Sequence, residues 1–90
     1  MLSRRVKVIN PLGLHARAAA SLVRLAGTFQ SDIKLVRTDN RVVADAKSIL
    51  SVLTLAAAKG TELEVKVSGD DKKEAIQKIE EIFRKGFGEI

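Results

Sequence analysis

The stretch Glu62-Leu63-Glu64-Val65-Lys66-Val67-Ser68 alternates strictly between polar and apolar side chains. Successive side chains of a β-strand point to opposite faces of a sheet, so this period of two predicts a strand with one buried and one wet face. Residues 4–9 and 32–37 follow the same pattern, and residues 41–45 form a shorter candidate after the turn signal Asp39-Asn40. The charged side chains expected on the wet face are Arg5, Lys7, Lys34, Glu64 and Lys66.

Helical periodicity replaces this alternation in the other segments. Residues 16–27 carry apolar side chains at the i, i+3, i+4, i+7 positions of one helix face, and residues 71–85 carry a second such stripe. Asp71 and Glu74 have the spacing of a capping box, and Gly86 marks the end of that helix. Residues 47–58 predict a shorter helix that ends before Gly60. The core-facing residues expected on the two long helices are Ala19, Leu22, Val23, Ala26, Ala75, Ile76, Ile79, Ile82 and Phe83.

The resulting order of elements, β-α-β-β-α-β-α, determines the fold class. Strands with one apolar face need helices on that face only. We therefore predict an α+β fold, an open-faced two-layer β-sandwich with a four-stranded antiparallel sheet and three helices on one face. The sequence contains no linker and no internal repeat, so residues 1–90 are expected to form a single domain.

Composition excludes several classes of protein. The 90 residues include no cysteine and one histidine, so we expect no disulfide, no metal site and no cofactor. No signal peptide or membrane span is apparent, which predicts a cytoplasmic protein. The net charge of +5 comes from scattered basic residues, and only 3% of residues are aromatic. A solvated basic surface, or an acidic protein partner, is therefore favoured over a nucleic acid.

The stretch with the clearest chemistry is residues 10–20, NPLGLHARAAA. Pro11 and Gly13 predict a tight loop, after which His15 lies at the N-cap of the first helix. Unpaired N–H groups there favour an anion and disfavour a charged imidazolium ring. A neutral His15 could therefore accept a phosphoryl group, which the backbone N–H groups of Ala16 and Arg17 and the Arg17 guanidinium would stabilise. The alternative is an ordinary surface histidine and a solvated arginine.

The second helix, residues 47–58, is apolar on nearly all sides. If Val52 and Leu55 point inward, Ile49, Leu50 and Leu53 remain partly exposed, and an exposed apolar patch is typical of a partner site. The alternative is that all five side chains belong to the core. Ser48 is a favoured N-cap residue for this helix. The basic residues that would surround the patch are Arg17, Arg24 and Lys47.

Four segments together resemble one known family. They are Gly13-Leu14-His15-Ala16-Arg17, Ala46-Lys47-Ser48-Ile49-Leu50, Ala58-Lys59-Gly60-Thr61 and Gly86-Phe87-Gly88-Glu89. In this order and spacing they resemble HPr, the histidine phosphocarrier of the bacterial phosphoenolpyruvate-dependent phosphotransferase system. The resemblance implies the same β-α-β-β-α-β-α sandwich. It also implies a carrier, not an enzyme, that receives a phosphoryl group from enzyme I and passes it to an enzyme IIA domain.

The resemblance also implies roles for single residues. His15 would carry the phosphoryl group at Nδ1, with Arg17 as the phosphate partner. Ser48 would be a target of HPr kinase/phosphorylase, which leaves a regulatory module controlled at Ser48 as the alternative function. A monomer is expected. The surface implied to dock the partners contains Ala20, Ser21, Arg24, Lys47, Ile49, Leu50 and Leu53.

Two departures from the family pattern bear on these expectations. Ala18 stands where the family usually has proline, which restores a backbone donor to the first helical turn. The segment Ala44-Asp45-Ala46 resembles the nitrogen-related paralogue NPr. Both sugar uptake and a nitrogen-related regulatory relay therefore remain open as the pathway. Hydrolysis by His15 with a serine is disfavoured, because the sequence offers no orienting acid for a triad.

Overall fold

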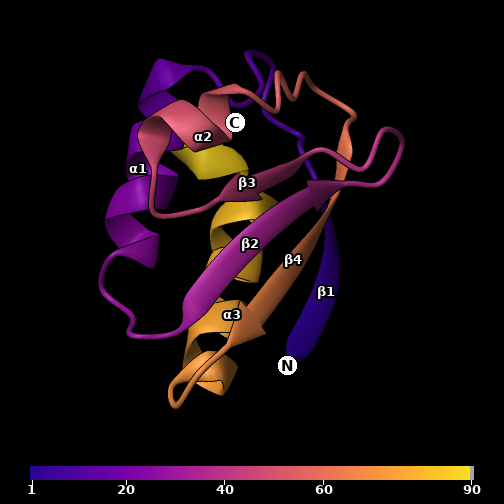
Figure 1. The fold of residues 1–90 in the computed structure, drawn as a ribbon. Helices are drawn as coiled ribbons and strands as arrows, with labels where there is room; N and C mark the ends of the chain where they lie inside the picture. Colours follow the sequence, from indigo (N-terminus) through magenta and orange to yellow (C-terminus); the bar gives the residue numbers. More distant parts are fainter. Residues whose placement is uncertain (90) are drawn as a thin grey trace.

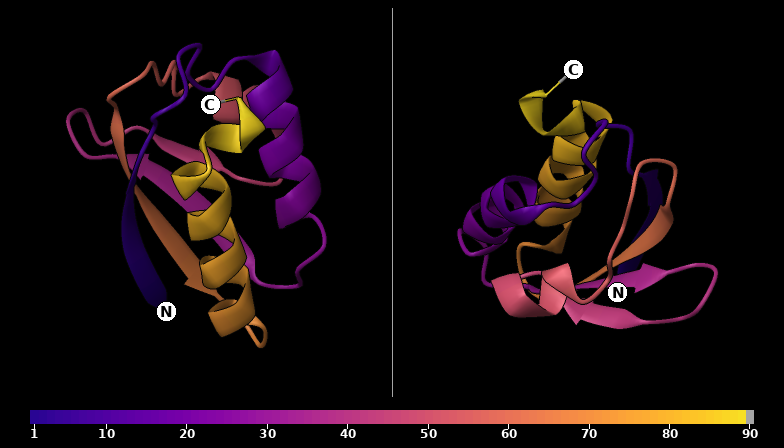
Figure 2. Two further views of the ribbon diagram at one scale, coloured as in Figure 1. Left: turned by 180° about the vertical axis from the view of Figure 1, so that it is seen from behind. Right: turned by 90° about the horizontal axis from the view of Figure 1, so that it is seen from above.

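A four-stranded antiparallel sheet carries the helices on one side (Figures 1 and 2). The computed structural model describes residues 1–89. Its strand order is β1-β4-β2-β3, so β2 and β3 are neighbours, whereas the connections from β1 to β2 and from β3 to β4 each pass over another strand. The predicted fold class is confirmed. The elements are β1 (Leu2–Lys7), α1 (Ala16–Ala26), β2 (Asp32–Arg37), β3 (Val43–Asp45), α2 (Ile49–Leu53), β4 (Glu62–Ser68), α3 (Lys72–Arg84) and the short 3₁₀ turn η1 (Gly86–Gly88).

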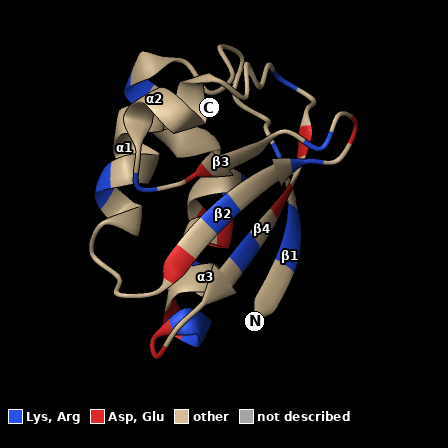
Figure 3. Cartoon of the chain, in the orientation of Figure 1, with Lys and Arg blue, Asp and Glu red and all other residues tan. Residues whose placement is uncertain are grey.

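Strand β4, with its strict alternation, lies inside the sheet between β1 and β2. Its apolar residues Leu63, Val65 and Val67 are fully buried, while Glu64 and Lys66 lie on the open face. Figure 3 shows that this face carries bands of charge across β1, β2 and β4. The predicted wet face is thus confirmed, and burial of the opposite face holds α1 and α3 against the sheet.

Two strand boundaries differ from the prediction. β1 covers residues 2–7 rather than 4–9, because Val8 pairs with the turn before β4. Its N–H donates to the Thr61 carbonyl at 2.9 Å, and its carbonyl accepts from the Gly60 N–H at 2.7 Å. β3 starts at Val43 rather than at residue 41, since Arg41 has a φ of +63° that a strand does not allow.

Helix α2 is shorter than predicted. It ends at Leu53 rather than near residue 58. Ala56 has a φ of +48°, which is incompatible with a continuing helix. The Arg37 guanidinium stabilises this ending, because its Nη1 donates to the Leu55 carbonyl at 2.8 Å. A side chain from β2 therefore stops the helix, which local periodicity does not reveal.

The predicted capping box at α3 is wrong. Asp71 is the N-cap residue, but its side chain makes no capping hydrogen bond. Its carboxylate instead accepts hydrogen bonds from the Ser31 hydroxyl, the Ser31 N–H at 2.9 Å and the Gln30 N–H at 2.8 Å. These bonds, that of the Ser31 hydroxyl first, hold the pKa of the Asp71 carboxyl below its usual range. Asp71 thus ties the start of α3 to the loop after α1.

Candidate functional site

His15 is the N-cap residue of α1, with an extended backbone (φ −73°, ψ 179°). Its carbonyl accepts the first helical hydrogen bond, from the Ala19 N–H at 2.8 Å. Its side chain bends over the start of the helix, where Nδ1 accepts a hydrogen bond from the Arg17 N–H at 3.3 Å. The imidazole therefore takes the place that a serine or aspartate takes in most helix caps.

The other ring nitrogen of His15 faces a carboxylate. Nε2 lies 2.7 Å from Oε2 of Glu89, in the last turn of the described chain. Because Nδ1 accepts an N–H, the proton of the neutral ring belongs on Nε2, from which it is donated to Glu89. This arrangement leaves the Nδ1 lone pair as the nucleophilic position of the ring.

Asn10 holds the Glu89 carboxylate from behind. The Asn10 side chain is fully buried, and its Nδ2 donates to Glu89 Oε1 at 2.9 Å and to the Gly13 carbonyl at 2.8 Å. The hydrogen bonds from Asn10 and His15 hold the pKa of the Glu89 carboxyl below its usual range. Glu89 is therefore a carboxylate at neutral pH and can accept a hydrogen bond from the His15 Nε2–H.

The loop that presents His15 depends on Gly13. Its φ of +68° lies in the left-handed region, and a Cβ at this position would lie 2.5 Å from the Ala57 carbonyl oxygen. The next residue, Leu14, donates its N–H to the same carbonyl at 2.8 Å. Only glycine allows the backbone to approach Ala57 so closely. The His15 loop is thereby joined to the segment that follows α2.

Arg17 lines the open depression beside His15 and Glu89. Within residues 1–89 its guanidinium makes no hydrogen bond and no ion pair, although its charge also lowers the pKa of Glu89. The Ala16 N–H likewise has no backbone acceptor in this part of the chain. An open depression surrounds these groups, lined by Pro11, Leu12, His15, Ala16, Arg17, Gly88 and Glu89. Its donors and positive charge suit a phosphoryl group.

The apolar patch predicted on α2 is exposed. Val52 and Leu55 are buried, whereas the exposed fractions of Ile49, Leu50 and Leu53 are 39%, 75% and 38%. The alternative that all five belong to the core is therefore wrong. Leu12, within the loop that leads to His15, is also 72% exposed, which no periodicity in the sequence indicates.

The remaining predicted contact residues surround His15 and α2 unevenly. Ala20 and Ser21 are half-buried on α1, and the Arg24 guanidinium lies 3.4 Å from the Ser21 hydroxyl. Lys47 is less free, because its Nζ donates to the Phe29 carbonyl at 2.8 Å. Its charge is thereby drawn toward the loop after α1 rather than toward the apolar patch.

Ser48 caps α2 as predicted. Its hydroxyl oxygen accepts a hydrogen bond from the Ser51 N–H at 3.3 Å, and its carbonyl accepts the Val52 N–H at 3.0 Å. The side chain is half-exposed. Its neighbour Ser51 also contributes to the local structure, because the Ser51 hydroxyl accepts the Asp45 N–H at 2.8 Å.

The residues that sequence reasoning missed are Glu89 and Asn10. Glu89 lies 74 positions from His15, so no local pattern connects them, and Asn10 reads as an ordinary loop residue. The one available signal is the segment Gly86-Phe87-Gly88-Glu89, which carried only the family resemblance. η1 brings this segment back to the start of α1, where Glu89 contacts the His15 ring.

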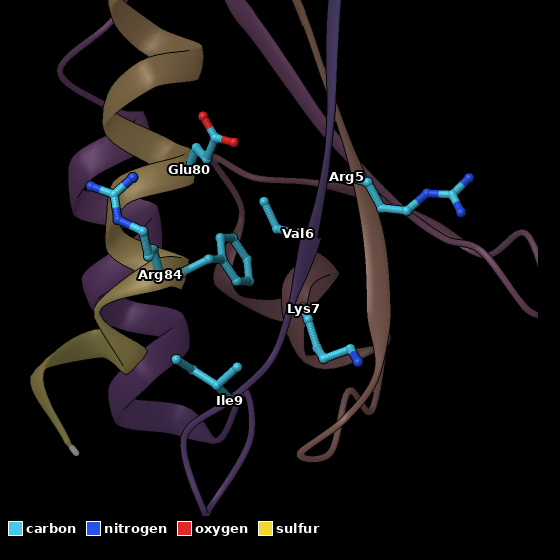
Figure 4. A pocket seen from close by; sticks show the side chains of 7 residues that line it. Arg5, Val6, Lys7, Ile9, Glu80 and Arg84 are labelled. Carbon is cyan, nitrogen blue, oxygen red and sulfur yellow. The ribbon is translucent and has the colours of Figure 1, made fainter.

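Other features of residues 1–89 offer less chemistry. A second hollow, of about 270 Å³, lies between β1 and α3 and is shown in Figure 4. Its apolar lining residues are Val6, Ile9 and Phe83, and Figure 4 shows that Arg5 points away from it. No group of three His, Cys, Asp or Glu side chains suited to a metal ion occurs in the described part of the chain. None of its helices is long and apolar enough to cross a membrane.

Comparison with known proteins identifies the family. Residues 2–85 match the model of the PTS HPr component phosphorylation site. The phosphocarrier protein HPr of Cupriavidus necator is 44% identical over 89 residues, covering 99% of this chain and 98% of the relative. The phosphocarrier protein NPr of Proteus mirabilis is 43% identical and covers 96% of this chain and 94% of the relative.

Solved structures agree with this match. The crystal structure of HPr from Thermoanaerobacter tengcongensis superimposes with a TM-score of 0.93 at 32% identity, covering 100% of this chain and 99% of that one. HPr from Bacillus anthracis gives a TM-score of 0.85 at 30% identity, covering 91% and 95%. Family membership implies enzyme I and enzyme IIA as the partners. This chain therefore belongs to the HPr family and is a phosphocarrier of the phosphotransferase system, a carrier of phosphoryl groups rather than an enzyme.

Proposed function

We propose that His15 is the residue that carries the phosphoryl group, at Nδ1, and that Arg17 and the start of α1 hold it there. The proposal rests on two contacts of the His15 ring: Nδ1 accepts the Arg17 N–H at the first turn of α1, and Nε2 lies 2.7 Å from Glu89 Oε2, which assigns the ring proton to Nε2. The ring is therefore held in the tautomer whose Nδ1 can attack phosphorus. The same donors that face Nδ1 are placed to bind the oxygens of the product.

The transfer step conserves protons on the ring. The Nδ1 lone pair forms a bond to the phosphorus of phospho-enzyme I, and the bond from phosphorus to the donor breaks, its electron pair returning to the donor. The Arg17 N–H gives up Nδ1 and becomes free for a phosphoryl oxygen. The Nε2 proton stays on the ring, where Glu89 stabilises the positive charge that develops. Enzyme IIA reverses these changes when it takes the group.

The experiment is phosphorylation by enzyme I with phosphoenolpyruvate and Mg²⁺, followed by intact mass and acid stability. We expect a gain of one phosphoryl group that is labile in acid, as a phosphohistidine is, and no gain for His15→Ala. A label that persists in His15→Ala would overturn the assignment.

The partners are proposed to dock on α2 and the adjoining face of α1. This surface combines the exposed Ile49, Leu50 and Leu53 of α2 with the exposed Arg24 of α1, the helix whose N-cap is His15. Ala20, Ser21 and Lys47 complete the proposed surface. Leu50→Glu should slow transfer from enzyme I without lowering the melting temperature, because Leu50 is 75% exposed. An unchanged rate would exclude Leu50 from the contact.

Regulation at Ser48 is the second candidate, supported by the half-exposed hydroxyl at the start of α2. A phosphoryl group there would place negative charge within the proposed docking surface. Incubation with HPr kinase/phosphorylase and ATP tests this, since an unmodified Ser48 would remove the role.

The two relatives named HPr and NPr are 44% and 43% identical to this chain, so sequence identity does not distinguish the sugar-uptake branch from the nitrogen-related branch. A single domain acting as a cytoplasmic monomer remains our prediction.

A further inference from the structure

Asn10 is a fully buried polar side chain at the entrance to the His15 loop. It follows β1 and precedes Pro11, and its Nδ2 donates in two directions. One bond, of 2.8 Å, reaches the Gly13 carbonyl within the same loop, and the other, of 2.9 Å, reaches Oε1 of Glu89. One amide group therefore joins two segments that are 79 residues apart in the chain.

The two oxygens of the Glu89 carboxylate have different partners. Oε1 accepts from Asn10, while Oε2 accepts from His15 Nε2 at 2.7 Å. A carboxylate held only by His15 could rotate about its side-chain bonds, and the ring could rotate with it. Held at both oxygens, the carboxylate has one orientation, and so has the ring. The geometry therefore forms a chain of contacts from Asn10 through Glu89 to His15.

We propose that Asn10 is a positioning residue for phosphoryl transfer, which holds Glu89 so that the His15 ring keeps its proton on Nε2 and its lone pair on Nδ1. The inference rests on the proposed function of His15. Asn10 does not contact the phosphoryl group, and it acts through Glu89 alone. A carboxylate that orients an imidazole fixes its tautomer and stabilises the cation formed as the ring reacts. Only a donor suits the position behind that carboxylate, and Asn10 supplies an amide N–H.

A double-mutant cycle with Asn10→Ala and Glu89→Ala tests the chain of contacts. The rate constant of phosphoryl acceptance from phospho-enzyme I should fall roughly tenfold in each single variant, as expected for one hydrogen bond to a charged group. The double variant should be no slower than Glu89→Ala. The ¹⁵N shifts of the neutral ring should show protonated Nε2 in the wild-type protein and a larger fraction of protonated Nδ1 in each variant.

A purely structural role for Asn10 gives a different result. Asn10→Ala would then lower the melting temperature but leave the His15 tautomer and the transfer rate unchanged, which would overturn the proposal. The proposal would also be overturned if Asn10→Ala lowered the transfer rate by the same factor in the wild-type protein and in the Glu89→Ala variant. Loss of transfer in His15→Ala together with a wild-type transfer rate and a wild-type His15 tautomer in Asn10→Ala would reject this inference alone. Transfer that persists in His15→Ala would instead reject the proposed function beneath it.

The wild-type protein provides a measurement that does not depend on folding of the variants. As acid protonates Glu89, the side-chain amide protons of Asn10 should shift with the same midpoint as the Glu89 carboxyl carbon. Asn10→Leu, which keeps the size of the side chain but removes the amide donor without adding a charge, gives the matched comparison for transfer and should behave as Asn10→Ala does. If the chemical shifts of the Asn10 amide protons did not change as Glu89 titrates, the proposed contact between Asn10 and Glu89 would be rejected.

Discussion

The first turns of α1 and α2 are both capped by a side chain that accepts a backbone N–H, but the surroundings of the two caps differ. His15 Nδ1 accepts the Arg17 N–H at 3.3 Å, and the Ser48 hydroxyl accepts the Ser51 N–H at 3.3 Å. Both cap residues have extended backbones. Helix capping alone therefore does not distinguish a functional residue from a structural one.

The two capping side chains differ in the contacts they make beyond the capping hydrogen bond. The His15 ring is held a second time, by Glu89, whereas the hydroxyl of Ser48 makes only its capping bond within residues 1–89. The helix behind His15 has 11 residues, and the helix behind Ser48 has 5. An imidazole fixed at both nitrogens has a defined lone pair, and the unpaired N–H groups of the first helical turn beside it favour an anion. The contact between His15 Nε2 and Glu89 is therefore the feature that makes His15 a candidate nucleophile as well as a helix cap.

Exchanging the cap chemistry should have the largest effect. His15→Ser gives α1 the kind of cap that α2 has, so we expect phosphoryl acceptance to disappear while the free energy of unfolding stays within about 1 kcal/mol of the wild-type value. Enzyme I-dependent labelling and urea unfolding measure the two effects. His15→Ala, which removes both cap and nucleophile, is the control. Labelling of the serine variant would contradict the assignment.

Arg17 should come next in size. Its guanidinium has no partner within the described chain, so Arg17→Ala should fold normally but lose a charge-assisted bond to the phosphoryl group. The rate of acceptance should fall between about tenfold and about 150-fold, equivalent to about 1.5–3 kcal/mol. Rapid-quench transfer measures it, with Arg24→Ala as the matched control, for which we expect less than about threefold. Equal losses in both variants would argue for general charge steering.

The cap of α2 should matter for stability but not for chemistry. Ser48→Ala removes the acceptor of the Ser51 N–H, which should lower the free energy of unfolding by about 1 kcal/mol. Transfer from enzyme I should stay at the wild-type rate. Ser48→Asp keeps the cap and adds a charge, so it separates loss of the cap from the effect of charge on docking. If Ser48→Ala lowered the rate of transfer from enzyme I, Ser48 would have a role beyond capping α2, contrary to this prediction.

Acid should weaken the fold through Asp71 and Glu89. The pKa of each carboxyl is held below its usual range, by hydrogen bonds from Ser31 first for Asp71 and from Asn10 first for Glu89. Their stabilising contributions are therefore complete above the unfolded pKa, near pH 4, and disappear as the pH falls through the lower folded pKa. Urea unfolding between pH 2 and about pH 7 should show this loss. Asp71→Asn should reduce stability at neutral pH and flatten the acid slope, whereas Asp70→Asn should do neither.

The fold was largely predictable because the side-chain pattern directly reflects burial. The alternation in β4 and the apolar stripes of α1 and α3 correspond to buried faces. Boundaries failed where a distant residue intervened. Arg37 stops α2 at a carbonyl 18 residues away, and Asp71 turns to Ser31 across 40 residues instead of capping its own helix.

The candidate site was predictable in part for the same reason. The position of His15 at a helix start follows from local signals in the loop and the helix. Its support from Glu89 and Asn10 depends on how the C-terminal turn returns to α1, which only the folded chain specifies. The exposure of Leu50 was one of two alternatives, and packing of Val52 and Leu55 decided between them.

The hydrogen bond from Leu14 to Ala57 joins the loop that carries His15 to the segment that follows α2. A partner that docks on α2, as proposed, fixes the distance and angle of its own reacting atom relative to His15 in the same event. Little further search is then needed before phosphorus and nitrogen meet, which raises the effective molarity of the two reacting groups. Folding of the chain has already restricted the motion of the His15 loop relative to α2, so binding of a partner need not do so.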